Sequence, residues 1–222
     1  MKRLTLILLY FIIGPGCHQK QPAQIALPEK QDLPYYNGPD FTPLWFDKNA
    51  VPDSIHSIPS FTFIDQNGNT ITEKTVANKI YIADFFFTSC PGICPKLTKN
   101  LKLVQEAFKD DSNVVLLSHS VTPLKDDPAA LKRYALNYGV IDNKWFLLTG
   151  NKDSIYTIAR KNYFADEDLG MQKDTSDFLH TENMLLIDTK RRIRGMYKGT
   201  SQLEMENIIA DIRQLEKEMK TD

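Results

Sequence analysis

Apolar residues follow two alternating patterns along the chain from about residue 58 onward. Short apolar runs and alternating stretches predict β-strands, whereas apolar residues three and four positions apart predict amphipathic helices. The predicted strands cover residues 61–64, 70–72, 80–87, 114–118, 145–149, 184–188 and 193–198. The predicted helices cover residues 97–108, 128–138, 152–161 and 201–219. Residues 80–87 are almost uniformly apolar, which indicates a strand buried on both faces.

Turn and cap residues separate these elements. Asn67-Gly68 predicts a hairpin turn between the first two strands. Asp127-Pro128 is typical of a helix start, and Ser201 with Glu204 forms a capping box for the last helix. The order of elements predicts an α/β sandwich, with helices flanking a mixed central sheet that has a parallel core and an antiparallel edge. A thioredoxin-like fold with an N-terminal extension fits this order.

The first residues are typical of an export signal. Lys2 and Arg3 precede an apolar run over residues 4–13, which is too short to span a bilayer because ten helical residues rise only about 15 Å. Small residues before Cys17 resemble a bacterial lipobox, although Gly14 stands where that pattern prefers leucine. We therefore predict a lipoprotein signal over residues 1–16 and a lipid anchor on Cys17. Ordinary secretory cleavage is the alternative, and either process places the protein outside the cytoplasm, on the periplasmic side of the cell envelope.

Residues 18–57 are rich in proline and polar residues and show no sustained period. This composition predicts a tether that leads into an irregular N-terminal extension, followed by a domain over residues 58–222. The part from Leu33 to Phe46 is too aromatic for a free linker, so we expect it to pack against the domain.

Composition excludes several classes of protein. With 222 residues, 42% of them hydrophobic and 25% charged, the chain matches one globular core rather than a fibrous or disordered protein. The formal charge of −1 gives no electrostatic case for binding nucleic acid. Three cysteines are too few for a disulfide framework, and Cys17 stands far from the other two.

Cys90 and Cys94 carry the candidate chemistry. They lie between the buried strand over residues 80–87 and the following helix, and sites in open α/β sheets form at such strand ends. Two residues four apart on a helical turn face the same side, so both sulfur atoms can meet one metal ion or each other. A helix N-terminus also favours the thiolate, which lowers thiol pKa values.

The pair has three alternative interpretations. Two buried small hydrophobic residues would leave the close spacing unexplained. A thioredoxin-type redox motif has C-x-x-C, one residue shorter than the spacing here. A structural zinc site usually needs a second pair of cysteine or histidine ligands, and the sequence offers none.

The segment from Phe87 to Pro95, F-T-S-C-P-G-I-C-P, resembles the F-T-x-C-P-x-x-C-P signature of the Sco/SenC family. The resemblance extends over about residues 58–217, and its second anchor is the D-F-L-H segment from Asp177 to His180 before a strand, one residue shorter than the family's D-x-x-x-H. It implies a thioredoxin-fold copper protein that assists assembly of the binuclear copper site of cytochrome c oxidase. It also implies copper ligation by Cys90, Cys94 and His180, with residues 167–176 as the insertion that brings the histidine to the thiols.

The donor set agrees with this implication, because two thiolates and an imidazole suit Cu(I) in a three-coordinate site. Cu(II) would add water or another oxygen donor, and the sequence leaves the physiological oxidation state open. One loop departs from the family's D-P-E-R-D pattern: Thr122 replaces the first acidic residue and Lys125 the arginine. We interpret the nearby His119 as a structural or supporting residue, with an accessory ligand role as the alternative.

The leading hypothesis is therefore a membrane-anchored metallochaperone that passes copper to the copper-site subunit of a terminal oxidase. Such a protein is not an enzyme in the strict sense. The alternative is a thiol-disulfide oxidoreductase that reduces the oxidase's cysteines through Cys90 and Cys94, so that another chaperone loads the copper. Other copper chaperones or thiol reductants are possible partners in both cases. Peroxidase activity is disfavoured, because the T-x-x-C pattern of peroxiredoxins is absent.

Overall fold

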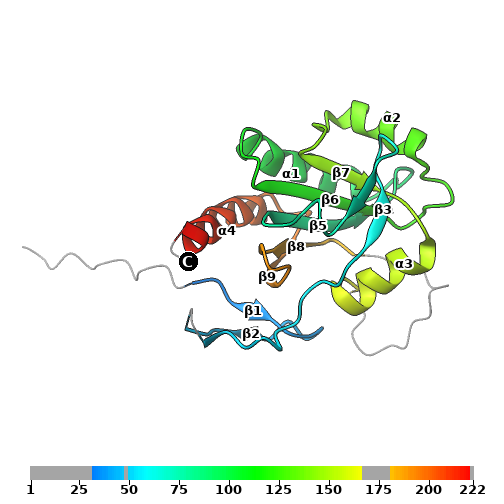
Figure 1. Cartoon of the computed structure of the whole chain (residues 1–222). Coiled ribbons are helices and arrows are strands. Elements are labelled where there is room, and N and C mark those ends of the chain that lie inside the picture. Colours follow the sequence, from blue (N-terminus) through cyan, green and yellow to red (C-terminus); the bar gives the residue numbers. More distant parts are fainter. Residues whose placement is uncertain (1–31, 48–49, 167–180, 221–222) are drawn as a thin grey trace, which may run out of the picture. The chain divides into compact units, whose positions relative to one another are not determined.

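The computed structural model describes residues 32–47, 50–166 and 181–220 (Figure 1). The predicted signal over residues 1–16, Cys17, residues 18–31 of the tether, the predicted insertion over residues 167–176 and His180 lie outside these residues. No helix in the described ranges has the length and apolar character needed to cross a bilayer.

A seven-stranded mixed sheet organises the domain, with the strand order β2-β1-β9-β8-β5-β6-β7. Its strands are β1 (Tyr35–Tyr36), β2 (Pro43–Leu44), β5 (Ile80–Phe86), β6 (Val114–Ser120), β7 (Trp145–Leu148), β8 (Asn183–Ile187) and β9 (Ile193–Lys198). Strands β5, β6 and β7 are parallel, whereas β8, β9, β1 and β2 pair antiparallel with their neighbours. A separate hairpin is formed by β3 (Thr62–Ile64) and β4 (Thr70–Thr72). The sheet thus has the predicted parallel core and antiparallel edge.

The described residues form four α-helices: α1 (Cys94–Ala107), α2 (Pro128–Tyr138), α3 (Lys152–Thr157) and α4 (Gln202–Lys220). Two apolar clusters cover the two faces of the sheet. One contains the buried faces of α1, α2 and α4, and the other contains residues of α3 and of the β3–β4 hairpin. Helices α1 and α4 lie side by side on the first face (Figure 1). All residues of β5 and β6 are buried, as expected for strands covered on both sides.

Local signals account for most helix boundaries. Asp127 caps α2 by accepting a hydrogen bond from the Ala130 N–H, and Gly139 ends the helix with a left-handed φ of 70°. Asn151 caps α3 through the Ser154 N–H. An α-helix was predicted over residues 152–161, but the α-helical part ends at Thr157. A five-residue π-helical segment over Ile158–Asn162 follows it, so the predicted type of helix was wrong for the second half. Periodicity in a short helix does not distinguish these hydrogen-bond patterns.

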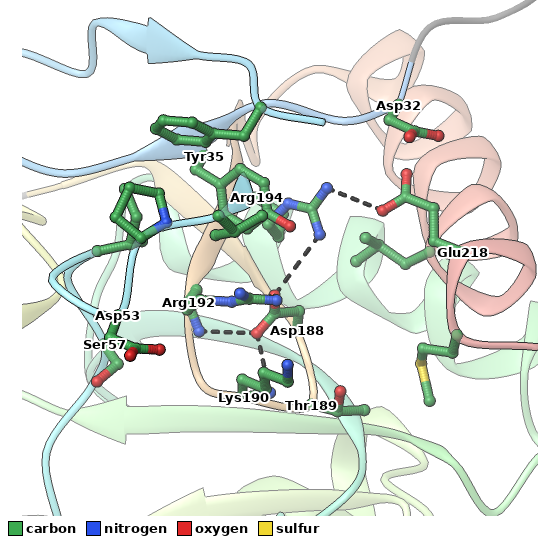
Figure 2. A pocket seen from close by; sticks show the side chains of 16 residues that line it. Asp32, Tyr35, Asp53, Ser57, Asp188, Thr189, Lys190, Arg192, Arg194 and Glu218 are labelled. Carbon is green, nitrogen blue, oxygen red and sulfur yellow. Dashed lines mark hydrogen bonds and ion pairs between the residues drawn. The ribbon is translucent and has the colours of Figure 1, made fainter. Parts of the chain in front are cut away.

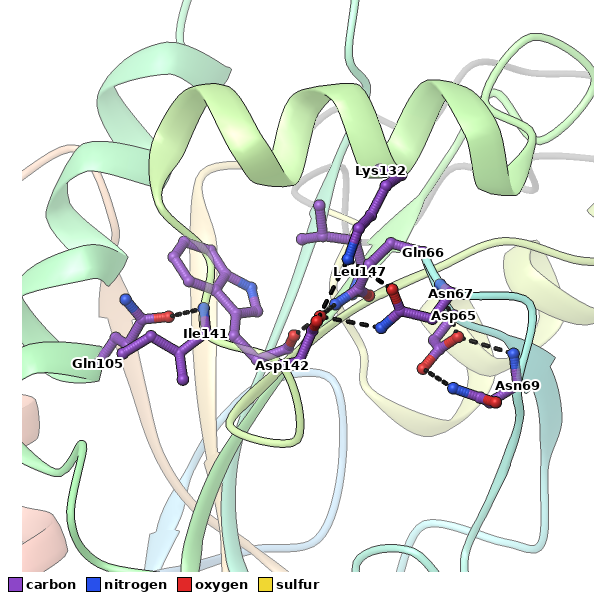
Figure 3. Close-up of polar contacts among 10 residues, drawn as sticks. Asp65, Gln66, Asn67, Asn69, Gln105, Lys132, Ile141, Asp142 and Leu147 are labelled. Carbon is purple, nitrogen blue, oxygen red and sulfur yellow. Dashed lines mark hydrogen bonds and ion pairs between the residues drawn. The ribbon is translucent and has the colours of Figure 1, made fainter.

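The turn of the β3–β4 hairpin is bound to the loop that precedes β7 (Figure 3). The Gln66 side-chain amide is buried; it donates to the Trp145 carbonyl at 3.1 Å and accepts from the Leu147 N–H at 2.8 Å. Asp142 accepts further hydrogen bonds from Gln66 and from Lys132 of α2, both at 3.2 Å. Side chains therefore join the hairpin to the main sheet, which it also meets at the single bridge between Ile64 and Thr149.

The N-terminal extension adds two strands to the antiparallel edge. Tyr36 of β1 pairs with Ile193 of β9. Arg194 donates to the Leu33 carbonyl at 2.6 Å, and its guanidinium lies 4.0 Å from the centre of the Tyr35 ring. The aromatic segment packs against the domain, as its composition predicted, but nothing in its hydrophobic pattern indicated strands before residue 58.

Candidate thiol and metal site

Cys90 and Cys94 lie where β5 leads into α1. The chain leaves β5 at Phe86 and turns, with the Cys90 N–H donating to the Phe87 carbonyl at 3.3 Å. Helix α1 then begins at Cys94, with a proline in its first turn. Cys94 is buried in the apolar cluster beneath α1, whereas Cys90 is only partly buried, and both are free thiols. The turn thus presents one thiol to solvent and keeps the other behind it.

The two thiols differ in acidity. Burial by itself would raise the pKa of the Cys90 thiol. Hydrogen bonds from the backbone N–H groups of Cys94, Gly92 and Ile93, and from the Cys94 thiol, outweigh that effect and hold the pKa below its usual value. The first turn of the helix thus favours a thiolate at Cys90.

The expectation of a lowered thiol pKa was wrong for Cys94. Burial raises the pKa of Cys94 well above its usual value, and the neighbouring Cys90 thiol and Asp84 carboxylate raise it further. One hydrogen bond from the Phe87 backbone opposes this rise without reversing it. Cys94 lies on the core-facing side of the helix start, where lost solvation is the larger effect.

Asp84 is a site residue that the sequence pattern concealed. It lies within the apolar run of β5, is almost fully buried, and accepts a hydrogen bond from the Ser118 hydroxyl. That hydroxyl in turn accepts from the Trp145 indole N–H at 2.8 Å. Burial raises the pKa of Asp84 to about 7. A carboxylate inside an otherwise apolar strand was the available signal.

The predicted third ligand, His180, lies outside the described residues, but the start of β8 shows where its neighbours lie. Leu185 pairs with Ala83 of β5 in an antiparallel register, and β8 begins two residues earlier, at Asn183. Thr181 is buried and accepts a hydrogen bond from the Asn183 N–H at 3.0 Å. The chain therefore enters β8 at the end of β5 that leads to Cys90.

His119 has a structural position. It is fully buried on β6, its ring stacks on Phe85 with centroids 5.1 Å apart, and it also contacts Phe63 and Tyr163. Burial lowers its pKa to about 4, so it is neutral near pH 7. These aromatic neighbours belong to the apolar cluster on the face opposite that of Cys94. His119 thus points away from the cysteines, which removes the accessory-ligand alternative.

The donors in the described ranges do not make a complete metal site. No group of three His, Cys, Asp or Glu side chains that could hold a metal ion occurs within residues 32–47, 50–166 and 181–220. Cys90 and Cys94 supply two soft donors, which matches the low coordination number that Cu(I) accepts.

The sequence model of the SCO1/SenC family matches residues 50–217 of the chain. The chain belongs to the SCO1/SenC family. It is 30% identical to a SCO1/SenC family lipoprotein from Bacillus anthracis strain Ames, with a TM-score of 0.63 over 72% of this chain and 95% of that one. BsSco, a member of the Sco family of cytochrome c oxidase assembly proteins in which a disulfide switch was identified, is 26% identical, with a TM-score of 0.60 over 72% of this chain and 93% of that one. The copper-bound ScoI of Bradyrhizobium japonicum is 26% identical, with a TM-score of 0.57 over 72% and 99%. The predicted family and thioredoxin-like fold are confirmed.

The loop in which this SCO1/SenC protein departs from the family pattern follows β6. The Thr122 hydroxyl donates a hydrogen bond to the Asp126 carboxylate at 3.0 Å. Lys125 is exposed. The substituted position thus has an internal hydrogen-bond partner, whereas the position of the family's arginine faces the solvent.

A cavity of about 280 Å³ lies at the other end of the sheet, between the N-terminal extension, the β8–β9 turn and the end of α4 (Figure 2). Its buried charges satisfy each other: Arg194 pairs with Glu218 at 2.9 Å, and Arg192 pairs with Asp188 at 2.8 Å. Neither Cys90 nor Cys94 lines this cavity.

Proposed function

We propose that this protein carries copper to the copper-site subunit of a terminal oxidase and holds the ion through Cys90, Cys94 and His180. The observation that carries the proposal is the unequal thiol pair at the β5–α1 turn, within a family fold whose solved members include a copper-bound protein. BsSco, a relative of the same fold, belongs to a family of cytochrome c oxidase assembly proteins.

The unequal thiols suit the transfer of a bound ion. Cys90 is accessible and ready to ionise, so it can meet an incoming copper ion, or a partner's thiolate, first. Cys94 is buried and must lose its proton as it binds metal, so its ligation releases a proton and depends on pH. A partner that offers two soft ligands can displace Cys90 first and Cys94 second, and copper then leaves by ligand exchange.

The same pair supports a second candidate, reduction of a partner's disulfide. The Cys90 thiolate would attack one sulfur of that disulfide and form a mixed disulfide, releasing one partner thiol. Cys94 would then attack Cys90, forming the Cys90–Cys94 disulfide and releasing the second partner thiol. Two electrons pass from this protein to the partner, and His180 has no part in either step. The disulfide switch identified in BsSco favours keeping this candidate.

An anaerobic Cu(I) titration against a competing chelator separates the two functions. The fully reduced protein without residues 1–17 should bind one equivalent tightly, and Cys90→Ser and Cys94→Ser should abolish competition. His180→Ala should weaken binding on the order of tenfold or more. His18→Ala, which removes a histidine of the tether, is the matched control and should bind as the parent does. Failure of the parent to compete, together with a readily cycled disulfide, would assign the protein to disulfide reduction.

We also propose that a lipid on Cys17 anchors the protein to a membrane, with the domain outside the cytoplasm. The lipoprotein from Bacillus anthracis with the same fold supports this localisation. The full-length protein expressed in a bacterial host should partition into detergent and carry an N-terminal mass shift for acyl chains. Cys17→Ser should remain in the aqueous phase; detergent partitioning of that variant would remove Cys17 from the anchor.

A further inference from the structure

A buried carboxylate connects the cysteine turn to the loop after β6. Asp126 is 1% exposed and accepts four hydrogen bonds, three from side-chain hydroxyls and one from a backbone N–H. Thr88 provides two of them, from its hydroxyl at 2.5 Å and its N–H at 3.1 Å. The hydroxyls of Ser120 and Thr122 provide the others, at 2.6 and 3.0 Å. We refer to Asp126 and these three donor residues as the Asp126 clasp.

We propose that Asp126 is the positioning residue of the thiol site: through Thr88 it sets where Cys90 stands relative to Cys94. The inference rests on the proposed function of that site, and it adds a residue that touches neither copper nor a thiol. Thr88 is two positions before Cys90, so a shift of Thr88 moves the turn that carries the accessible thiol.

The hydrogen bonds around the turn explain why the Asp126 clasp can influence the position of Cys90. The β5–β6 ladder ends when the Val121 N–H donates to the Phe86 carbonyl at 2.9 Å. Beyond that point the turn is held by the 3.3 Å bond from the Cys90 N–H to the Phe87 carbonyl and by the backbone N–H groups that donate to the two thiols. The two hydrogen bonds from Thr88 to Asp126 join the turn to the loop after β6. The Cys90 side chain is only partly buried, whereas Cys94 is buried in the core and is the first residue of α1. The position of Cys90 therefore depends on Thr88.

The clasp also accounts for threonine at position 122, where the family pattern has an acidic residue. The Thr122 hydroxyl donates to the Oδ2 atom of Asp126, which already accepts from Thr88 and Ser120. The ionised acidic residue of the family pattern could not donate this hydrogen bond. Thr122 thus binds Asp126 from the loop after β6, outside the cysteine turn.

All four groups that donate to the Asp126 carboxylate are neutral, so hydrogen bonds rather than ion pairs hold the clasp together. A buried carboxylate is stable only when its oxygen atoms are fully hydrogen-bonded. Charge-assisted hydrogen bonds are shorter and stronger than neutral ones, so four of them fix the donor positions closely. No lysine or arginine within the described ranges pairs with Asp126.

Two matched substitutions test the proposal. Thr88→Val and Thr122→Val each remove one hydroxyl donor from the same carboxylate and keep the side-chain shape, but only Thr88 belongs to the cysteine turn. We expect Thr88→Val to weaken Cu(I) affinity by about tenfold, in the range seen when groups that support metal ligands are lost. It should also shift the midpoint potential of the Cys90–Cys94 couple in a glutathione redox buffer. Thr122→Val should change the affinity by less than about threefold, and Thr88→Ser, which restores the hydroxyl, should recover the parent values.

Urea unfolding of each variant shows whether a loss of stability alone explains the result. The proposal is overturned if Thr88→Val keeps the parent affinity and potential, or if both valine variants shift these values equally in proportion to their stability. If Thr88→Val does not fold, Thr88→Ala, which lacks the hydroxyl, and Thr88→Ser, which keeps it, provide the same comparison. Failure of the parent protein to bind Cu(I) would count against the proposed copper carrier, whereas the redox potential would still test the clasp.

Discussion

Two buried aspartates at opposite ends of the central sheet are stabilised in different ways. Asp188, at the β8–β9 turn, pairs with Arg192 at 2.8 Å and with Arg194 at 3.5 Å (Figure 2). Asp84, in β5 near the cysteines, has a hydroxyl as its side-chain partner, and its pKa rises to about 7. Asp188 is thus held by ion pairs, whereas the buried aspartate near the thiols accepts from a neutral hydrogen-bond donor.

This difference matters for the proposed copper site. The Cys90 thiolate is favoured by backbone N–H groups rather than by a lysine or arginine. Fixed dipoles stabilise negative charge without placing a positive charge beside it, so a copper ion would not be repelled from the site. Arginines at the other end have no such restriction and can tie the N-terminal extension and α4 to the sheet.

The largest expected effect concerns Asp84. Its pKa is raised in the folded state, so its contribution to stability is present below the unfolded pKa of about 4 and is lost as the pH rises through about 7. As the pH rises from 4 to 8, the unfolding free energy of Asp84→Asn should therefore increase relative to that of the parent by on the order of 4 kcal/mol. Urea unfolding of both proteins across this range, with the thiols reduced, measures the gain. A constant difference would show that Asp84 ionises normally.

His119 sharpens this test because its linkage has the opposite sign. Its pKa falls to about 4 in the folded state, so the stability that it contributes is lost as the pH falls from about 6.5 to 4. In the parent these two slopes oppose each other between pH 4 and 6.5. In Asp84→Asn only the histidine slope remains, and stability should rise with pH over that interval.

A smaller but still large effect is expected at the ion-paired end. Arg194→Ala leaves Asp188 with one arginine and removes the ion-pair partner of Glu218, which should cost about 3 kcal/mol of unfolding free energy. Because this cluster is remote from the cysteines, Cu(I) affinity should not change. Urea unfolding and the chelator titration measure the two quantities, and Arg213→Ala is the control, because Arg213 is an exposed arginine on α4, the helix that carries Glu218. A loss of copper affinity in Arg194→Ala would show that the two ends are coupled.

The smallest effect is expected at the exposed pair between Lys132 and Asp142 (Figure 3). These side chains are 39% and 50% exposed and 3.2 Å apart, so Lys132→Ala should cost less than about 1 kcal/mol. Gln66→Ala, which removes a buried amide from the same cluster, should cost more, because the Leu147 N–H loses its acceptor. Thermal unfolding of the two variants ranks them, and equal losses would contradict the assigned role of burial.

The hydrophobic pattern predicted the elements that depend on local periodicity. The apolar run at residues 80–87 became the buried central strand β5, and the cysteines lie at the predicted strand-to-helix turn. The two-residue strands β1 and β2 were not predicted, because two residues carry no period. They are strands because β1 pairs with β9 and β2 pairs with β1 in the folded chain. The change from α to π geometry after Thr157 was missed for a similar reason.

By itself, the sequence determined the kind and order of the main elements, the place of Cys90 and Cys94 between a buried strand and a helix, and the resemblance to a copper-binding family. Tertiary structure decided which of the two thiols is accessible and ionises readily, because burial depends on contacts from the rest of the chain. It also decided that Asp126, 38 residues from Thr88, supports the cysteine turn. Such long-range hydrogen bonds leave no periodic signal, since only the folded topology brings their partners together.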